Sequence, residues 1–188
     1  MFPFGWPHDQ YQAWVRAQEA MGKGVTISLD DDIFKSIRME GEFTLTSGKK
    51  SNYFYDFEQL APNYMTFVSA MLHEKFRTDG VAFEFVVGPS YGGIIPGYLI
   101  ADFSDSHFVA FDPKKGNFRG QVKKIDGRFI VIDDVISTYG TVDDTIKAVA
   151  ENNPAARCVG VGCFVFRGDS LREERPKTYY LHRGEIEV

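Results

Sequence analysis

Residues 128–141 have the sequence RFIVIDDVISTYGT, which is the most informative segment for predicting the fold. Four apolar residues at 129–132 predict a short strand that is buried on both faces. Asp133 and Asp134 stand where that strand should end, and a small turn rich in hydroxyl groups follows. Apolar residues then recur at helical spacing within residues 142–150, which predicts a helix. The stretch therefore predicts a strand, a turn and a helix N-terminus in direct succession.

A turn of this kind favours an anion, because backbone N–H groups and the helix dipole attract negative charge at a helix N-terminus. Serine and threonine hydroxyls add donors, and Gly140 lets the backbone approach a ligand closely. The two carboxylates would repel a phosphate, so we expect them to accept hydrogen bonds from sugar hydroxyls or to face a ligand that carries a metal. The combination predicts a pocket for a ribose 5-phosphate group.

The alternative is an ordinary strand and capped helix, with Asp133 and Asp134 merely in solvent. Paired acids directly after a buried strand gain nothing from the core, which disfavours this alternative.

Length and composition indicate one well-filled domain with a small appendage, because 44% of the 188 residues are hydrophobic. The formal net charge of −5 argues against a general nucleic-acid or membrane-surface binder. The sequence lacks a long apolar stretch and a signal peptide, so we expect a cytoplasmic protein with neither nucleic acid nor membrane as a partner. Cys158 and Cys163 lie on one expected strand, where their reduced thiols should face opposite sides.

Strands and helices alternate from about residue 62 to residue 167, which predicts an α/β fold with a mostly parallel central sheet flanked by helices. Before them we expect a short helix over residues 30–39 and two short strands around a turn at 47–48. We therefore divide the chain into an N-terminal hood with a base-binding segment at 1–60 and an α/β core at 61–188.

Ligands bind at the carboxyl ends of the strands in a sheet of this kind. Three candidate segments should converge at that edge: the glycine-rich turn at 88–93, the basic stretch at 114–119 and residues 133–141.

The residue order in DDVISTYGT, at 133–141, resembles the phosphoribosyl diphosphate (PRPP) motif of type I phosphoribosyltransferases. Three further segments resemble the orotate phosphoribosyltransferases of that family and follow the family's order. They are GEFTLTSGKKSNYFYDF at 41–57, VVGPSYGGIIPG at 86–97 and CFVFRGDSLRE at 163–173. The resemblance covers about residues 37–170 and implies a type I phosphoribosyltransferase fold with a small N-terminal hood.

The resemblance also implies a role for residues in each part of the site. PRPP would be bound by Asp133, Asp134, Val135, Ile136, Ser137, Thr138, Tyr139, Gly140 and Thr141. The base would be bound by Phe54, Tyr55, Ser137 and Arg167, and the pyrophosphate by Ser90, Tyr91, Lys114 and Lys115. The catalytic candidates are Asp133, Asp134, Lys114 and Lys115.

Some residues expected from the resemblance are missing. Thr46 and Gly92 stand where the family has lysines, and the basic loop, here DPKKGNFRG at 112–120, lacks the family's histidine. Several pyrophosphate contacts would then have to come from other basic residues, namely Lys49, Lys50, Arg119 or Lys123.

The implied reaction transfers ribose 5-phosphate from PRPP to a nitrogen of a nucleobase, orotate or a related pyrimidine, and releases pyrophosphate. The resemblance further implies magnesium that rides on the diphosphate, and a homodimer that shares its basic loop.

Two other hypotheses stay open. One is a PRPP-binding regulator or degenerate homologue without turnover, which the missing basic residues favour. The other is a carboxylate–metal phosphatase built on Asp133 and Asp134, which would need further acidic ligands close by.

Overall fold

The computed structural model describes residues 31–45, 48, 50–89, 91–119, 125–172 and 176–184. The chain divides into two compact units, residues 1–35 and residues 36–188. Helix α2 (Asp31–Ser36) contains the described part of the first unit. The hairpin and the central sheet lie in the second unit, and the boundary expected at residue 60 stays a prediction.

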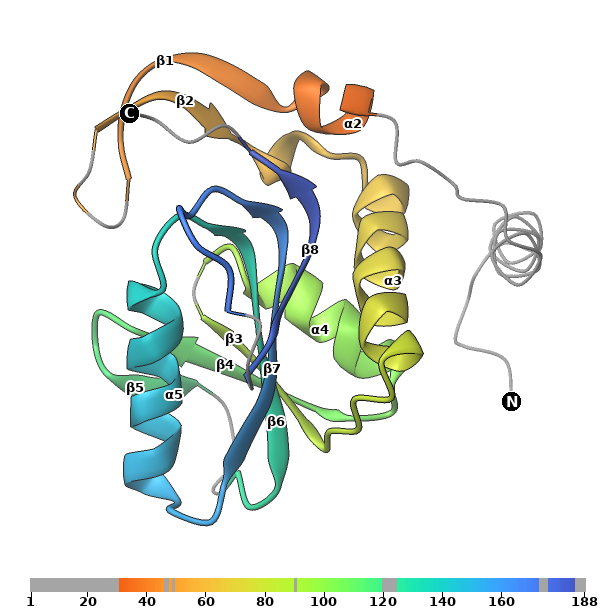
Figure 1. Ribbon diagram of the computed structural model, residues 1–188, viewed down its shortest axis with the longest axis vertical. Helices are drawn as coiled ribbons and strands as arrows, with labels where there is room; N and C mark the ends of the chain where they lie inside the picture. The colour runs from red at the N-terminus through yellow and green to blue at the C-terminus, as the bar shows by residue number, and fades with distance from the viewer. Residues whose placement is uncertain are drawn as a thin grey trace. The chain divides into compact units, whose positions relative to one another are not determined.

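A six-stranded sheet forms the centre of the second unit, with the strand order β5-β4-β3-β6-β7-β8 (Figure 1). The strands are β3 (Phe85–Pro89), β4 (His107–Asp112), β5 (Asn117–Arg119), β6 (Arg128–Ile136), β7 (Arg157–Phe166) and β8 (Thr178–Arg183). Neighbouring strands are parallel, except that β5 runs antiparallel to β4. The predicted α/β fold with a mostly parallel sheet is confirmed.

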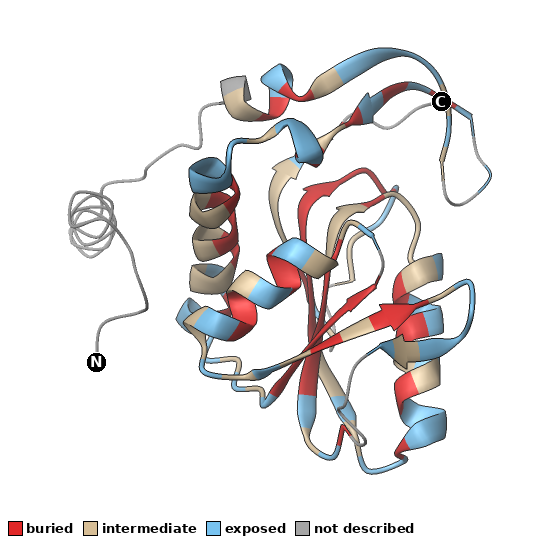
Figure 2. Ribbon diagram, turned by 180° about the vertical axis from the view of Figure 1, so that it is seen from behind, coloured by how far each residue is buried: buried red, intermediate tan, exposed pale blue. Residues whose placement is uncertain are grey.

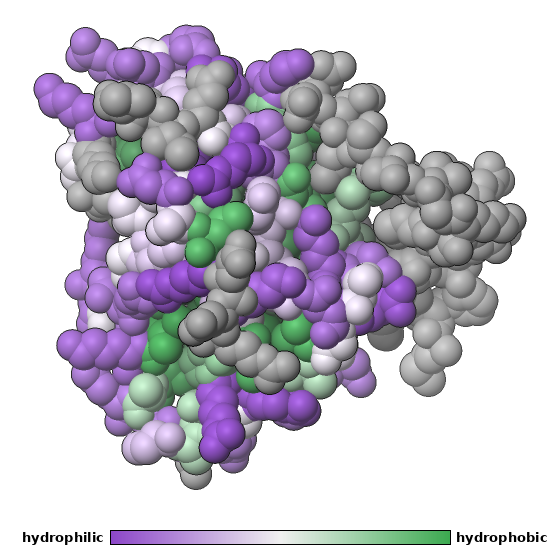
Figure 3. All heavy atoms as spheres, in the orientation of Figure 1, coloured by the Kyte–Doolittle hydropathy of each residue, from purple (hydrophilic) through white to green (hydrophobic). Residues whose placement is uncertain are grey.

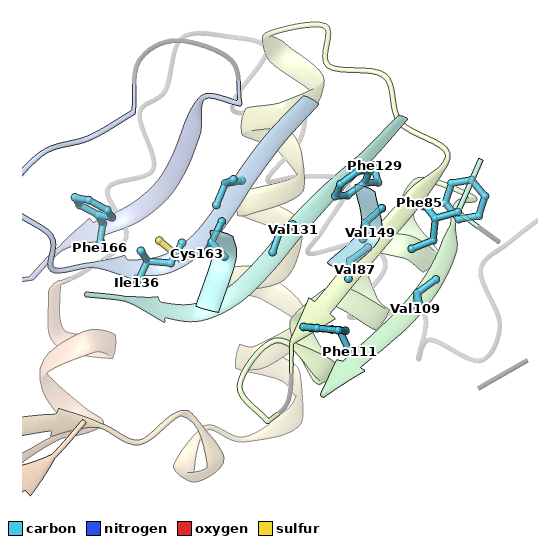
Figure 4. Close-up of a cluster of buried hydrophobic side chains, with 13 residues drawn as sticks. Phe85, Val87, Val109, Phe111, Phe129, Val131, Ile136, Val149, Cys163 and Phe166 are labelled. Atoms are coloured by element: carbon cyan, nitrogen blue, oxygen red, sulfur yellow. The ribbon is translucent and has the colours of Figure 1, made fainter. Parts of the chain in front are cut away.

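Helices cover both faces of this sheet, as the alternation of elements predicts. Helices α3 (Pro62–Thr78) and α4 (Ile94–Phe103) pack on one face, and α5 (Gly140–Asn152) packs on the other (Figure 1). Between α5 and the sheet lies a core of apolar side chains from β3, β4, β6 and β7 (Figure 4). Strand β3 is buried along its whole length, in agreement with its continuous apolar sequence (Figure 2).

An antiparallel hairpin of β1 (Arg38–Thr44) and β2 (Lys50–Tyr55) precedes the sheet, and the short 3-10 helix η1 (Phe57–Gln59) leads from it to α3. The helix expected over residues 30–39 extends three residues beyond Ser36, where α2 ends. Helix α2 ends at Ser36 because Arg38 and Met39 already pair with Tyr55 and Phe54 across the hairpin.

Strand β6 is longer than its apolar run predicts. The expectation that it ends before Asp133 is wrong, because the ladder with the ten-residue strand β7 continues to the pair Ile136–Phe166. Both aspartates therefore lie within a strand.

The expectation that the two cysteines face opposite sides is also wrong. The ladder between β6 and β7 shifts register between Phe129 and Ile130, so that Phe129 pairs with Cys158 whereas Ile130 pairs with Gly160. This irregularity changes the alternation of β7, and both Cys158 and Cys163 pack against the core on the α5 face. Burial raises the pKa of the Cys158 thiol to about 12.

The surface of the face seen in Figure 3 is mostly hydrophilic, with smaller hydrophobic patches between the polar residues. None of the described helices is long and apolar enough to cross a membrane.

Candidate functional site

The strand order places a topological switch point between β3 and β6. The chain continues from β3 to β4 on one side of β3, whereas β6 lies on its other side. Open α/β sheets bind ligands at such a point, at the carboxyl ends of the two strands. The segments that leave these ends are the β3–α4 turn and the β6–α5 turn, which contain two of the three segments expected from the sequence.

Beyond Val131, strand β6 lies against the β3–α4 turn. The ladder between β3 and β6 ends at the pair Val87–Val131. A Cβ atom on Gly93 would lie 2.2 Å from the carbonyl oxygen of Ile132, and one on Gly92 would lie 2.1 Å from Oδ1 of Asp134. The turn therefore needs glycine at position 93, where backbone of β6 occupies the space of a side chain, whereas at position 92 the space is filled by the carboxylate of Asp134.

This packing bears directly on the lysine that the family has at position 92. A lysine at position 92 would require the Asp134 carboxylate to move. The observed position of this carboxylate is therefore possible only because residue 92 has no side chain.

Asp133 and Asp134 are partly buried near the end of β6, where their carboxylates accept backbone hydrogen bonds. Oδ1 of Asp134 accepts from the N–H of Val135 at 2.7 Å, and Oδ1 of Asp133 accepts from the N–H of Asp134 at 3.1 Å. Burial raises the pKa of both carboxyl groups, and the neighbouring Asp134 raises that of Asp133 further. A ligand that brings hydroxyl donors or a cation would stabilise their charged forms.

The turn after β6 offers donors to an anion. Residues 137–141 are partly or fully exposed and lead into α5. Tyr139 is the N-cap residue of α5, and within the described part of the chain no side chain caps this helix. The first-turn N–H groups can therefore donate to a ligand.

The side chain of Tyr139 is directed away from the turn and anchors it to neighbouring elements. Its Oη atom lies 2.8 Å from Oγ1 of Thr178 and accepts a hydrogen bond from the N–H of Arg172 at 3.1 Å. Its ring packs against Phe166, with 5.8 Å between ring centroids. The side chain therefore points from the turn toward β7 and β8.

Arg167 follows β7 at the same edge and is buried beneath the hairpin. Its guanidinium carbon lies 3.8 Å from the centroid of the Tyr53 ring, and its Nη2 donates to Oγ of Ser51 at 3.0 Å. Its backbone N–H donates to the carbonyl of Ile136 at 2.8 Å, and a Cβ atom on Gly168 would lie 3.1 Å from the carbonyl oxygen of Ser137. The structure thus brings Arg167 and Ser137 together.

The two aromatic candidates on β2 do not share a face. Exposure alternates along this strand, so that Ser51, Tyr53 and Tyr55 are buried whereas Phe54 is 39% exposed on the other side. Sequence reasoning missed Ser51 and Tyr53, although the alternation of β2 itself could have identified them as the inward residues.

Lys114 and Lys115 lie exposed in the tight turn between β4 and β5. Their backbone N–H groups donate to Oδ1 of Asp112 at 3.2 and 3.3 Å, while Oδ2 of Asp112 accepts from Arg119 at 2.7 Å. The Arg119 guanidinium lowers the pKa of Asp112, and Asp112 followed by Tyr91 raises the pKa of Arg119. Arg119 is therefore tied to Asp112 beside Tyr91, whereas the two lysine side chains extend into solvent.

Several sequence candidates lie outside the described residues: Thr46, Lys49, Ser90 and Lys123. Lys50 is described and is exposed at the start of β2. Within the described ranges, no three histidine, cysteine, aspartate or glutamate side chains gather into a group that could hold a metal ion.

Comparison with known proteins gives curated relatives named orotate phosphoribosyltransferase. The chain is 30% identical over 145 residues to the orotate phosphoribosyltransferase of Pyrococcus abyssi, a match that covers 73% of this chain and 78% of the relative. It is 32% identical over 155 residues to that of Desulforamulus reducens, covering 80% and 79% of the two chains.

The crystal structure of orotate phosphoribosyltransferase from Aeropyrum pernix has the same fold, with a TM-score of 0.64 at 19% identity. That match covers 81% of this chain and 92% of the other. No family model matches the sequence.

Proposed function

Because the chain belongs to the orotate phosphoribosyltransferase family of type I phosphoribosyltransferases, we propose that it transfers ribose 5-phosphate from PRPP to a ring nitrogen of orotate or a related pyrimidine. The observation that carries this proposal is that hydrogen-bond acceptors for a sugar and hydrogen-bond donors for a phosphate lie next to each other at the switch point of the sheet. The carboxylates of Asp133 and Asp134 precede a helix N-terminus that no described side chain caps. A ribose carrying a 5′-phosphate needs both groups.

In the proposed reaction a bond forms between the ring nitrogen and the anomeric carbon of PRPP, and the bond from that carbon to the pyrophosphate oxygen breaks, with its electron pair leaving on pyrophosphate. The proton that the ring nitrogen loses passes to water. The carboxylates of Asp133 and Asp134 would accept hydrogen bonds from the ribose hydroxyls, and residues 137–141 would hold the 5′-phosphate. The protein's contribution to the rate would be positioning and stabilisation of charge, without a covalent intermediate.

The two aspartates also suit a magnesium ion that PRPP carries, because their negative charge would favour a cation held on the diphosphate without direct ligation by the protein. Burial raises the pKa of both groups, so a nearby cation would stabilise their charged forms. Bound to the diphosphate, magnesium would supply positive charge that offsets the charge of the leaving pyrophosphate.

The base is proposed to lie near Arg167. A guanidinium can hold a planar carbonyl or carboxylate through two parallel hydrogen bonds, which a lysine cannot reproduce. Stacking on Tyr53 fixes the plane of the guanidinium, and Ser51 occupies one of its donors. Arg167→Lys should therefore raise KM for orotate far more than KM for PRPP, and equal effects on both would remove Arg167 from the base site.

The test is a screen of nucleobases with PRPP and magnesium that follows pyrophosphate release. We expect release that depends on orotate or a related pyrimidine, and strong impairment in Asp133→Asn and Asp134→Asn at saturating magnesium. Rescue of these variants by excess metal would favour direct metal ligation and the phosphatase alternative.

The regulator alternative keeps one observation in its favour. Position 92 carries no cation, and Arg119 is tied to Asp112. A protein of that kind would bind PRPP tightly and release no pyrophosphate with any base, so calorimetric binding measured beside the screen separates the two functions.

We also propose the cytoplasmic homodimer expected from the sequence. An exposed apolar stripe supports the dimer: Tyr91 is 75% exposed just before α4, and Ile95 and Tyr98, one and two turns further, are 53% and 60% exposed. Sedimentation equilibrium should give twice the chain mass, and Ile95→Glu should lower it. A monomer mass for the parent would contradict the proposal.

A further inference from the structure

The segment that follows β7 is fixed to the proposed phosphate turn through the backbone of Arg172. The N–H of Arg172 donates to Oη of Tyr139 at 3.1 Å, and its carbonyl accepts from the N–H of Thr178 at 2.9 Å. Tyr139 and Thr178 are themselves joined through their side-chain oxygens at 2.8 Å. Three parts of the chain, the turn, the segment after β7 and strand β8, therefore meet at Arg172.

The side chain of Arg172 returns from this point to the first turn of α5. Its two terminal nitrogens donate to the two carboxylate oxygens of Asp143 at 2.7 and 2.8 Å. Its guanidinium carbon also lies 3.9 Å from the centroid of the Tyr139 ring. This two-pronged ion pair, stacked on an aromatic ring, is a geometry that arginine provides and lysine does not.

Asp143 carries a charge of the wrong sign for an anion site. It lies in the first turn of α5, and its N–H donates to the carbonyl of Tyr139 at 2.7 Å. An aspartate in this position competes with a bound phosphate for the positive end of the helix dipole and repels the phosphate directly. Pairing with Arg172 removes most of that repulsion.

We propose that Arg172 is a positioning residue for the ribose 5-phosphate end of PRPP. Its side chain cancels the charge of Asp143 beside the phosphate turn. Its backbone N–H, which Arg172→Gln keeps, holds the Tyr139 side chain that anchors this turn to β8. It acts through these two residues and does not touch the substrate. This inference rests on the proposed function, because it assumes that residues 137–141 bind a phosphate.

The experiment compares the parent with Arg172→Gln, Asp143→Asn and the double variant. Each is titrated calorimetrically with ribose 5-phosphate and, separately, with inorganic pyrophosphate. Arg172→Gln should weaken ribose 5-phosphate binding by about two- to fivefold, the effect of one charge at a helix terminus. Asp143→Asn should bind it at least as tightly as the parent, and the double variant should return to the affinity of the parent. Binding of pyrophosphate should be the same in all four proteins.

Two further measurements separate charge from structure. The deficit of Arg172→Gln should shrink at high salt, because salt screens exposed charges. Arg172→Lys keeps the positive charge but cannot make the two parallel hydrogen bonds to Asp143. This variant should bind ribose 5-phosphate better than Arg172→Gln. The matched control is Lys147→Gln, which breaks the 3.9 Å pair with Glu151 further along α5 and should change nothing.

A double variant that stays as weak as Arg172→Gln would overturn the inference, and so would unchanged affinity in all variants of a parent that binds ribose 5-phosphate. Failure of the parent to bind either PRPP or ribose 5-phosphate would instead overturn the proposed function, and the inference with it.

Discussion

The β6–α5 turn and the β3–α4 turn are both strand–turn–helix connections at the same edge of the sheet, yet their glycines are in opposite surroundings. A Cβ atom on Gly92 or Gly93 would lie within 2.2 Å of atoms of β6. On Gly140, at the start of α5, the nearest atom would be Oγ1 of Thr138 at 3.6 Å, an ordinary contact. Atoms of the protein itself fill the β3–α4 turn, whereas the β6–α5 turn has space for a ligand.

The largest effect should come from adding a methyl group to the filled turn. In Gly93→Ala the new Cβ atom would meet the backbone carbonyl of Ile132, and backbone inside a sheet has little freedom to move. We expect a loss of about 3 kcal/mol or more in the free energy of unfolding, at the upper end of what overpacking costs. Urea denaturation measures it, with Gly140→Ala as a control because a Cβ atom there would meet its nearest atom at 3.6 Å and the residue has no positive φ. A variant no less stable than the control would contradict the packing described here.

In the open turn, side-chain changes should affect binding and leave stability unchanged. Thr138→Ala and Thr141→Ala each remove a hydroxyl donor proposed to meet the 5′-phosphate, and we expect each to weaken PRPP binding by about 1.5–3 kcal/mol. Calorimetry measures the affinity. The matched control is Thr66→Ala, which removes an exposed hydroxyl on α3. Parent-like affinity in the double variant would mean that the turn does not hold the phosphate.

The difference between the turns also explains how far the sequence could be interpreted. The β6–α5 unit was predictable, because an apolar run, two acids, a hydroxyl-rich turn and a helical pattern occur within one short stretch. The strand's continuation through Asp133 and Asp134 was not, because it depends on pairing with β7 some thirty residues later. The packing at position 92 was hidden for the same reason, since the group that fills the space beside Gly92 is the carboxylate of Asp134.

The base site stays a prediction. The resemblance implies Arg167, but the contacts of this residue with Ser51 and Tyr53 bridge more than a hundred residues. Sequence spacing cannot measure such contacts. The alternation along β2 separates Phe54 from Tyr55, whereas the resemblance places both at the base.

Asp133 lies where the two turns meet, and it should show a conflict between stability and function. Its pKa is raised in the folded protein, so the folded state holds this proton more tightly than the unfolded state. Stability should therefore fall as pH rises from the ordinary aspartate range through the raised pKa. Asp133→Asn should remove that part of the pH dependence, stabilise the protein by about 0.5–2 kcal/mol at neutral pH, and impair PRPP use.

Thermal unfolding across pH measures this effect, and the exposed Asp144→Asn serves as the control. A variant less stable than the parent at neutral pH would show that the hydrogen bond from the N–H of Asp134 outweighs the cost of the buried charge.

The smallest effect on stability concerns Gly140, the glycine of the open turn. Its φ is not among the positive values that favour glycine, and its nearest neighbour leaves room for a methyl group. Nothing in the ligand-free protein requires glycine there. Alanine at the start of a helix loses less conformational entropy on folding, so Gly140→Ala should raise the free energy of unfolding by about 0.5–1 kcal/mol.

The requirement for glycine should appear only when PRPP is present, because a methyl group on this residue would stand between the backbone and an incoming phosphate. We therefore expect Gly140→Ala to be more stable than the parent and yet to bind PRPP more weakly, as measured by urea denaturation and calorimetry on the same preparation. Unchanged affinity would mean that the phosphate is held by hydroxyl groups without close approach of the backbone. Lower stability would mean that the open turn is as tightly packed as the β3–α4 turn, and the contrast between them would be lost.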